Sequence, residues 1–213
     1  NLDNHIPIYV AGNGPKACAA AGAYGDGWTT IGRDPVALNT ALGHISDGAA
    51  AVDRSLAADF HTTLFSCTSV LRPGEDLTSE RVINQVGSWV TTELHFFYEI
   101  WNKLGRKDDM IPPHFLNMWD EYLDRVNNFS LPEDARFRQI HEGHAVYLMP
   151  EEKRFVTPEA ISAICIVGSA EDIIDQIREI EKTGIREINI MPADDYARDA
   201  VREFAEAVIP AFR

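Results

Sequence analysis

Residues 12–16 combine the residue types of an anion-binding turn. Gly12 and Gly14 allow the backbone to turn sharply and to approach a ligand closely. Pro15 suits the first turn of a helix, where its missing N–H costs nothing. Free amides and the positive dipole end at such a helix start attract phosphate, and Lys16 adds a full positive charge. The turn therefore predicts a phosphate site, although it is neither a Walker loop nor a complete dinucleotide fingerprint. The alternative is a strand-to-helix turn that binds nothing.

Two histidines three residues apart form a second polar cluster. His141 and His144 flank Glu142 and Gly143, and a histidine can move a proton or orient a substrate near neutral pH. A metal site is disfavoured, because no third ligand is evident and Gly143 argues against a stable helix that presents both rings. We predict a catalytic or substrate-orienting role for the two histidines and no metal. The alternative is that both rings stabilise a loop by bonding to backbone carbonyls.

A helix predicted over residues 79–104 is more aromatic than a surface helix needs to be. Such a helix covers a pocket, packs against another subunit, or packs into the core. We predict that it lines a substrate pocket near the two histidines, with contributions from Trp89, His95, Phe97 and Trp101. Core packing remains the alternative for each of these four side chains.

Alternating strands and helices must position these residues. Strands are predicted at residues 6–11, 27–31, 61–71 and 185–191, each with helical material behind it. The first reads as a buried inner strand, because it is rich in β-branched and aromatic residues. The short connection between the first two strands favours parallel pairing through a βαβ unit. The chain therefore contains about four βα units and belongs to the α/β class.

Local signals fix several helix ends. Asp34 begins a helix that is predicted to extend to about Ala58. Ser169 is a natural N-cap, and Asp172 three residues later completes an acidic variant of the capping box. The helix that follows has a single isoleucine-rich face and ends at Gly184, which serves as a left-handed cap.

Composition and charge restrict the partners and the compartment. The 213 residues carry a net charge of −14, which argues against nucleic acid as a partner. No apolar run approaches the roughly 20 residues needed to span a bilayer, and no secretory signal precedes the first strand. Cys18, Cys67 and Cys165 lie in apolar segments and are expected to be buried free thiols. These features favour a cytoplasmic protein that is not bound to a membrane.

Two stretches together resemble the bacterial luciferase-like family, whose members use reduced flavin or a deazaflavin coenzyme. The first is Ile-Pro-Ile-Tyr-Val-Ala-Gly-Asn-Gly-Pro-Lys at residues 6–16, followed by Ala-Gly-Ala-Tyr-Gly-Asp-Gly-Trp at residues 21–28. The second is the helix-and-strand unit at residues 167–192. The resemblance covers about residues 6–34 and 160–213, and the long middle section matches only loosely.

The resemblance implies a (β/α)8 barrel of the TIM type. Four units are half of such a barrel, which typically needs about 250 residues. Residues 1–213 would then be the C-terminal half of a single barrel, with residues 72–160 as a helical insertion after its seventh strand. We accordingly expect a partner, either an N-terminal half-barrel chain or a second copy in a homo-oligomer. An open half-barrel would expose strand edges and an apolar layer.

The resemblance also implies a cofactor, FMN or a deazaflavin coenzyme, bound near the turns that follow the first two strands. The residues that match these turns, or neighbour them, are Gly12, Asn13, Gly14, Lys16, Gly32 and Arg33. Asn13 and Lys16 are the side chains expected to meet the phosphate, and a bidentate contact from Arg33 would be chemically apt.

The activity implied by the resemblance is that of an oxidoreductase acting on a small organic molecule. With flavin the reaction would be monooxygenation, and with deazaflavin it would be hydride transfer. Two other classes stay open. One is a cofactor-free half-barrel that acts as a binding or assembly subunit, because fold does not guarantee chemistry. The other is a non-redox hydrolase or lyase that uses His141 and His144.

Overall fold

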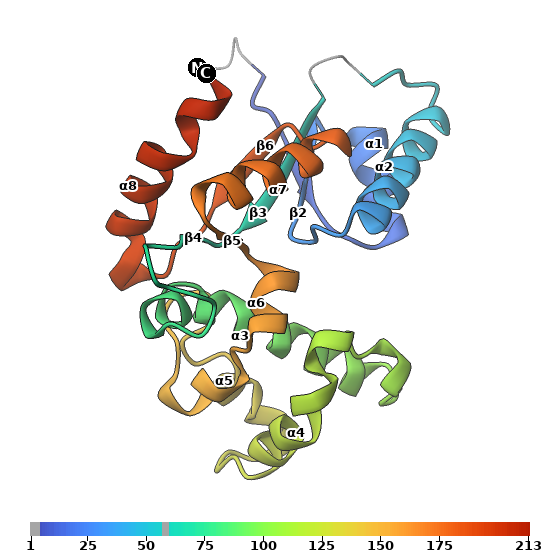
Figure 1. The fold of residues 1–213 in the computed structure, drawn as a ribbon. Helices are drawn as coiled ribbons and strands as arrows, with labels where there is room; N and C mark the ends of the chain where they lie inside the picture. The colour runs from blue at the N-terminus through green and yellow to red at the C-terminus, as the bar shows by residue number, and fades with distance from the viewer. Residues whose placement is uncertain (1–4, 57–59) are drawn as a thin grey trace. The chain divides into compact units, whose positions relative to one another are not determined.

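The computed structural model describes residues 5–56 and 60–213, which form two compact units. Within the described residues, the first unit contains the chain up to Ser66 together with Asp175–Ile190. The second contains Cys67–Ile174 and Met191–Arg213. Figure 1 follows the chain through its elements by colour.

A parallel four-stranded sheet forms the centre of the first unit. Its strands lie in the order β1-β2-β3-β6, with bounds Tyr9–Ala11, Gly27–Thr30, His61–Ser66 and Glu187–Ile190. Every neighbouring pair is parallel. The predicted α/β class with parallel strands is therefore confirmed, and the turns after β1 and β2 lie at the same edge of the sheet.

Two helices of the first unit pack against each other through glycines. Helix α1 (Pro15–Tyr24) lies beside α2 (Pro35–Ala50) (Figure 1). A methyl group built on Gly22 would lie 1.8 Å from the carbonyl oxygen of Ile45, and one on Gly48 would lie 2.1 Å from that of Ala19. Only hydrogen fits at these two positions, so the two helix backbones approach each other directly.

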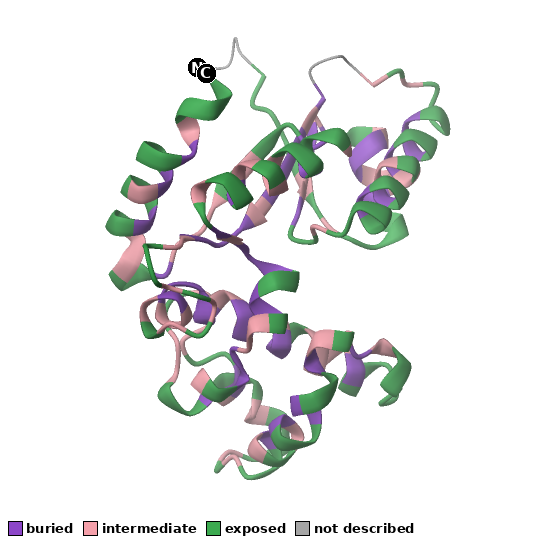
Figure 2. Cartoon of the chain, viewed as in Figure 1, coloured by how far each residue is buried: buried purple, intermediate pink, exposed green. Residues whose placement is uncertain are grey.

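The first strand is shorter and more exposed than its sequence predicts. Residues 6–11 were expected to form a buried strand, but β1 begins at Tyr9, and Ile6, Ile8 and Tyr9 are 78%, 60% and 47% exposed (Figure 2). The reason is its place in the sheet, since within the described residues β1 pairs with β2 alone. An edge strand leaves apolar side chains uncovered that an inner strand would bury.

Helix α2 also ends earlier than its sequence predicts. It begins at Pro35, and the Oδ1 atom of Asp34 accepts a hydrogen bond from the Ala37 amide at 2.8 Å, as expected of an N-cap. It stops at Ala50 and is followed by a turn. Ala58, the expected end, lies outside the described residues.

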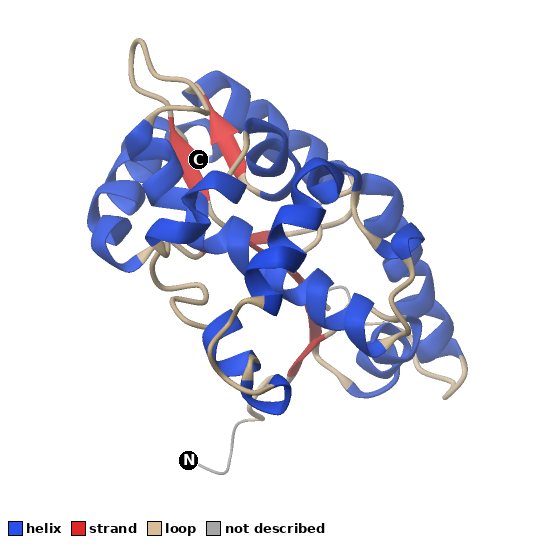
Figure 3. Ribbon diagram, turned by 90° about the horizontal axis from the view of Figure 1, so that it is seen from below, coloured by secondary structure: helices blue, strands red, loops and turns tan. Residues whose placement is uncertain are grey.

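The second unit is mainly helical, as Figure 3 shows. Its two strands, β4 and β5, span Thr68–Val70 and Ile166–Gly168 and pair in parallel. Its α-helices are α3 (Glu80–Lys103), α4 (Trp119–Asn127), α5 (Phe137–Ile140), α6 (Pro158–Ile164) and α8 (Ala197–Ala207). Its short 3-10 helices are Asp108–Met110, Pro113–Met118, Glu133–Ala135, Pro150–Phe155, Asp194–Tyr196 and Ile209–Phe212. Among the described helices, none is long and apolar enough to cross a membrane.

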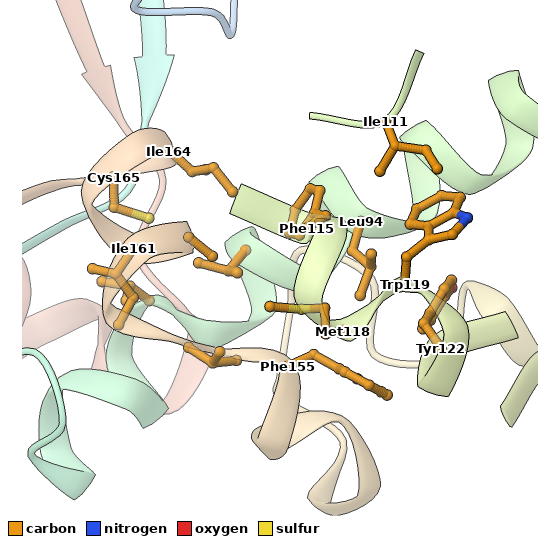
Figure 4. Packing of buried hydrophobic residues seen from close by; sticks show 14 of the residues in the cluster. Leu94, Ile111, Phe115, Met118, Trp119, Tyr122, Phe155, Ile161, Ile164 and Cys165 are labelled. Atoms are coloured by element: carbon orange, nitrogen blue, oxygen red, sulfur yellow. The ribbon is translucent and has the colours of Figure 1, made fainter. Parts of the chain in front are cut away.

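The core of the second unit is built around α3. Its fully buried members include Leu94, Phe115, Tyr122, Phe155 and Ile161, which come from five different elements. Figure 4 shows these side chains interleaving, with the aromatic rings of α4 and its preceding turn next to α3. Burial of such side chains is worth roughly 1.5–3 kcal/mol each, so this cluster holds the helices together.

The strand predicted over residues 61–71 is two strands rather than one. The change occurs at Cys67, where β3 ends and β4 begins, and the carbonyl of Cys67 accepts a hydrogen bond from the Ile166 amide at 3.0 Å. β3 pairs with β6, whereas β4 pairs with β5. The apolar run alone does not reveal a change of partner strand. Cys67, Cys18 and Cys165 are buried and form no disulfide among the described residues, as predicted.

Helix α7 (Ala170–Lys182) begins with the predicted capping box. The Asp172 amide donates to Ser169 Oγ at 3.2 Å, and the Ser169 amide donates to Asp172 Oδ2 at 3.0 Å. The Ser169 hydroxyl also donates to Asp172 Oδ2 at 2.7 Å, and this bond, with the one from the Ser169 amide, holds the pKa of the Asp172 carboxyl below its ordinary value. Gly184, two residues after the helix, has a φ of +99°, so it adopts the predicted left-handed conformation.

Candidate functional site

Thr30 joins the two predicted cofactor turns in the first unit. Its hydroxyl donates a hydrogen bond to Asn13 Oδ1 at 2.8 Å and accepts one from the Gly32 amide at 3.3 Å. Because the Asn13 oxygen is occupied, its amide nitrogen remains as a donor. The structure thus brings the turn after β1 and the turn after β2 together through Thr30 and leaves the Asn13 amide nitrogen as a donor on the first.

The backbone of Gly12 is held in place by two side chains. Its carbonyl oxygen accepts hydrogen bonds from the Trp28 indole at 2.8 Å and from the Cys18 thiol at 3.5 Å. A methyl group at this position would lie 2.5 Å from the Cβ of Ala17. Glycine is therefore required here by close packing, and the turn is rigidly attached to both β2 and α1.

The start of α1 offers its amides to a ligand. Gly14 precedes the helix, no described side chain caps it, and its first turn holds no acidic residue. Helix α2 differs, because Asp34 occupies its first amides. A methyl group on Gly14 would have nothing within 4 Å, and Lys16 is exposed beside it. This combination of uncapped amides and a free cation suits a phosphate.

A network of polar side chains lies in the second unit. His95, which is fully buried, places Nε2 3.1 Å from Oε1 of Glu152 and Nδ1 3.2 Å from Nδ1 of His144. Glu152 is 2% exposed and also lies 3.6 Å from the guanidinium of Arg125. The three elements α3, α4 and the turn at residues 150–155 therefore converge on one carboxylate.

This network of Glu152, His95 and His144 sets the protonation pattern of His144. The carboxylate of Glu152 can only accept, so the Nε2 of His95 carries a proton. In the neutral pair, the Nδ1 of His95 then accepts from the Nδ1–H of His144, which leaves the Nε2 of His144 as a free acceptor. Glu152 acts on His144 through His95, an arrangement that suits a general base.

The loop that carries the two predicted catalytic histidines has an unusual backbone. Gly143 and Ala145 have φ values of +76° and +58°, the second uncommon for a residue with a side chain. The Ala145 amide is held by a 2.8 Å hydrogen bond to Thr92 Oγ1 of α3. The rings of His141 and His144 lie 4.6 Å apart, and His141 also lies 3.1 Å from Glu99. The two histidines are thus together, and their catalytic role remains a prediction.

The aromatic residues predicted to line a substrate pocket lie in or against the core of the second unit. Trp101 packs edge to face on Trp119 and donates its indole N–H to Asp108 at 3.2 Å. Phe97 lies near Phe115, and Trp89 is partly buried against the same cluster. Only His95, among the four, contacts the histidine loop through a polar atom. Their role toward substrate remains a prediction.

A resident metal ion has no evident place among these groups. Within residues 5–56 and 60–213, no three His, Cys, Asp or Glu side chains are arranged to hold one ion. The imidazole of His95 instead lies between the ring of His144 and the carboxylate of Glu152.

The model of one protein family matches this sequence. The model of the family described as luciferase-like monooxygenase matches residues 2–187, which is most of the chain. The chain belongs to this family. The resemblance inferred from residues 6–34 and 160–213 is thereby confirmed.

Two solved structures show the fold of this luciferase-like chain. One is a coenzyme F420 dependent tetrahydromethanopterin reductase from Methanopyrus kandleri, with a TM-score of 0.64 and 19% identity over 98% of this chain and 51% of that one. The other is an F420-dependent secondary alcohol dehydrogenase, with a TM-score of 0.54 and 18% identity. The match covers 99% of this chain and 50% of that one. The luciferase-like chain therefore spans about half the length of either relative. At these identities the likeness shows the shared fold alone.

Sequence reasoning missed Thr30 and Glu152. Thr30 is the last residue of β2 and neighbours the end of β1, so the parallel pairing of two predicted strands contained the signal that could have found it. Glu152 pairs with a histidine 57 residues away. No local pattern distinguishes it from its exposed neighbour Glu151, so the sequence held no signal for it.

The environment of His144 predicts an acid-dependent loss of stability. Burial, followed by the charges of His95 and His141, lowers its pKa from 6.5 to about 4. As the pH falls, the histidine therefore becomes protonated in the unfolded chain before it does so in the folded protein. The stability contributed by neutral His144 is therefore complete above about pH 6.5 and is lost as the pH falls toward 4.

We expect His144→Gln to show a smaller fall in melting temperature than the wild-type luciferase-like chain between about pH 7.5 and 4.5. Thermal melts at several pH values measure the difference. Val146→Ala, an uncharged change in the same loop, is the control and should retain the wild-type fall. If His144→Gln and wild type lose stability in parallel, the histidine is not held neutral by its surroundings.

Proposed function

We propose that this luciferase-like chain forms the phosphate-binding part of an oxidoreductase that uses a reduced flavin or deazaflavin cofactor. The observation that carries the proposal is the uncapped start of α1, with Lys16 exposed beside it and the amide of Asn13 oriented by Thr30. An anionic group fits this set of donors, because amides, a carboxamide and an ammonium group all belong to residues at one helix start.

The chain's own residues would act on the cofactor by binding and orientation. Lys16 and the first amides of α1 hold the phosphate, and Asn13 donates a further hydrogen bond. Gly12 keeps the turn close to β2 through its bond to Trp28 and close to α1 through its bond to Cys18. When bound, the cofactor supplies the electron chemistry, either hydride transfer or activation of oxygen.

We further propose that His144 exchanges a proton with the substrate. Its low pKa keeps it neutral at physiological pH, so Nε2 has a lone pair for a substrate proton, and a ring of this weak basicity gives that proton up again readily. Glu152 and His95 act as positioning residues, because they fix which nitrogen of His144 carries a hydrogen. His141, held by Glu99, would assist from the same loop.

The relatives support redox chemistry as the general class. The family is described as luciferase-like monooxygenase. The reductase and the alcohol dehydrogenase that share its fold both depend on coenzyme F420. We propose that a small organic molecule is the substrate and that hydride transfer and monooxygenation are the two candidate reactions. An absorbance spectrum of the purified protein separates bound flavin, bound deazaflavin and the cofactor-free alternative.

We also propose that a second β/α half completes the sheet. β1 is an edge strand in the described residues, and apolar side chains lie exposed on and before it. The partner would be another part of the protein, a separate N-terminal half-barrel chain or a second copy. Covering such an edge removes a template for aggregation.

Replacement of Lys16 tests the phosphate site. In the intact enzyme, Lys16→Ala is expected to weaken binding of FMN or the phosphorylated deazaflavin by about 1–3 kcal/mol, the range for a lost charge-assisted bond. Binding of riboflavin, which lacks the phosphate, should change little. Fluorescence titration measures both affinities.

A matched control removes a cation elsewhere. Lys107→Ala changes an exposed lysine of the second unit and should leave both affinities unchanged. Equal losses for FMN and riboflavin in Lys16→Ala would show that Lys16 acts through folding. Unchanged affinity for both ligands would refute the assignment of the turn.

A further inference from the structure

A small cavity in the second unit lies outside both groups of residues described above. Its volume is about 210 Å³, and it is partly open to solvent. Val146, Leu148 and Ala193 form its apolar walls. Its polar lining consists of Asn84, Tyr147, Asp195 and Tyr196. The cavity is large enough for a small organic molecule.

The walls of this cavity are held together by backbone hydrogen bonds. The Asp194 amide donates to the carbonyl of Val146 at 3.0 Å, which ties residues 193–196 to the histidine loop. The Tyr196 amide donates to the carbonyl of Ala193 at 3.0 Å and closes a tight turn. The left-handed residues Gly143 and Ala145 immediately precede the wall. The cavity is therefore formed before any ligand binds, and its loop conformation costs energy that a functional role would explain.

The polar side chains that line the cavity have no partner among the described residues. In the part of the chain that the structure describes, the side chains of Asn84 and Asp195 make no hydrogen bond or ion pair, nor do the hydroxyls of Tyr147 and Tyr196. Asp195 is the one charged residue among those that line the cavity. A ligand that fills this space meets one carboxylate, one carboxamide and two phenol rings.

The chemistry of these groups suits a cation. A carboxylate forms charge-assisted hydrogen bonds with an ammonium group, and tyrosine rings attract a cation placed over their faces. The amide oxygen of Asn84 can accept a further N–H. An anion would meet the charge of Asp195 with no compensating cation in the lining. The apolar walls favour a short hydrocarbon portion beside the charge.

We propose that this cavity binds a small organic ammonium ion, with the ammonium group on Asp195 and the hydrocarbon portion against Val146 and Leu148. No residue of the phosphate turn lines this cavity, and binding here does not depend on cofactor chemistry. It shares its loop with His144, so an occupant would rest on the segment that carries the histidine.

Three probes of nearly equal size test the proposal. Isobutylammonium, isobutanol and isobutyrate are titrated separately into the isotopically labelled protein, and binding is followed from the side-chain amide of Asn84 and the rings of Tyr147 and Tyr196. We expect isobutylammonium to bind at least about tenfold more tightly than the neutral and anionic probes. Comparable binding of isobutanol would show a merely apolar cavity and would overturn the proposal.

Adjacent aspartates provide the matched variants. Asp195→Asn removes the charge with little change in size and should weaken isobutylammonium binding by about tenfold while leaving isobutanol unchanged. Asp194→Asn removes an equally exposed charge that does not line the cavity, and it should change binding by less than about twofold. If the two variants weaken binding equally, general charge attraction explains the effect and no cation site exists. If Asp195→Asn binds like wild type, the proposal is likewise wrong.

Discussion

Gly48→Ala is expected to lower the free energy of unfolding of the first unit by about 1–3 kcal/mol, the usual cost of overpacking. The new methyl group would lie 2.1 Å from the carbonyl oxygen of Ala19, and 2.5 Å from its Cα. Both are backbone atoms, so relief requires α1 and α2 to move apart. Urea denaturation followed by circular dichroism measures the loss.

Gly43 provides the control within the same helix. A methyl group built there has nothing within 4 Å, so the change removes only the flexibility of glycine. Gly43→Ala is expected to raise the free energy of unfolding by about 0.5–1 kcal/mol. If both variants gain stability, the helices do not approach each other as closely as the structure shows.

The same pair of variants bears on the phosphate site. Helix α1 carries Gly14 and Lys16 at its start, so a displacement of α1 moves the donors that we assign to the cofactor. Gly48→Ala should weaken FMN or deazaflavin binding in the intact enzyme, whereas Gly43→Ala should not. A destabilised variant with unchanged cofactor affinity would count against the placement of the site on α1.

Features whose cause is local were predictable from the sequence. The capping box of Ser169 and Asp172 is confirmed because both partners lie within one turn of helix. The parallel strands were predicted from the short βαβ connection and from the β-branched and aromatic content of the strand segments. The turn after β1 was recognisable because close packing on Ala17 requires a glycine at position 12, and the sequence shows that glycine directly.

Features that depend on distant partners were not predictable. The strand predicted over residues 61–71 divides at Cys67 because its two halves pair with β6 and β5, each about a hundred or more residues away along the chain. The exposure of β1 depends on which strands flank it, and hydrophobicity alone cannot report that. Glu152 gains its importance only where α3 and α4 meet it.

Glu152→Ala is expected to cost the second unit about 3–5 kcal/mol of stability, the range for breaking a buried pair by removing one partner. His95, fully buried, would lose the acceptor for its Nε2–H, and the guanidinium of Arg125 would lose its nearest anion. Glu151→Ala changes an exposed neighbour and should alter stability by less than about 0.5 kcal/mol.

A conservative variant separates packing from the protonation pattern. Glu152→Gln keeps the shape and an oxygen that accepts from His95, so its stability should lie between Glu152→Ala and wild type. However, the amide nitrogen can also donate, and the tautomer of His95 is then no longer fixed. The nitrogen chemical shifts of the histidine rings should show His144 held as the Nδ1–H form in wild type and as a mixture of tautomers in Glu152→Gln. A stable Glu152→Ala protein, or a His144 tautomer indifferent to residue 152, would show that Glu152 does not position His144.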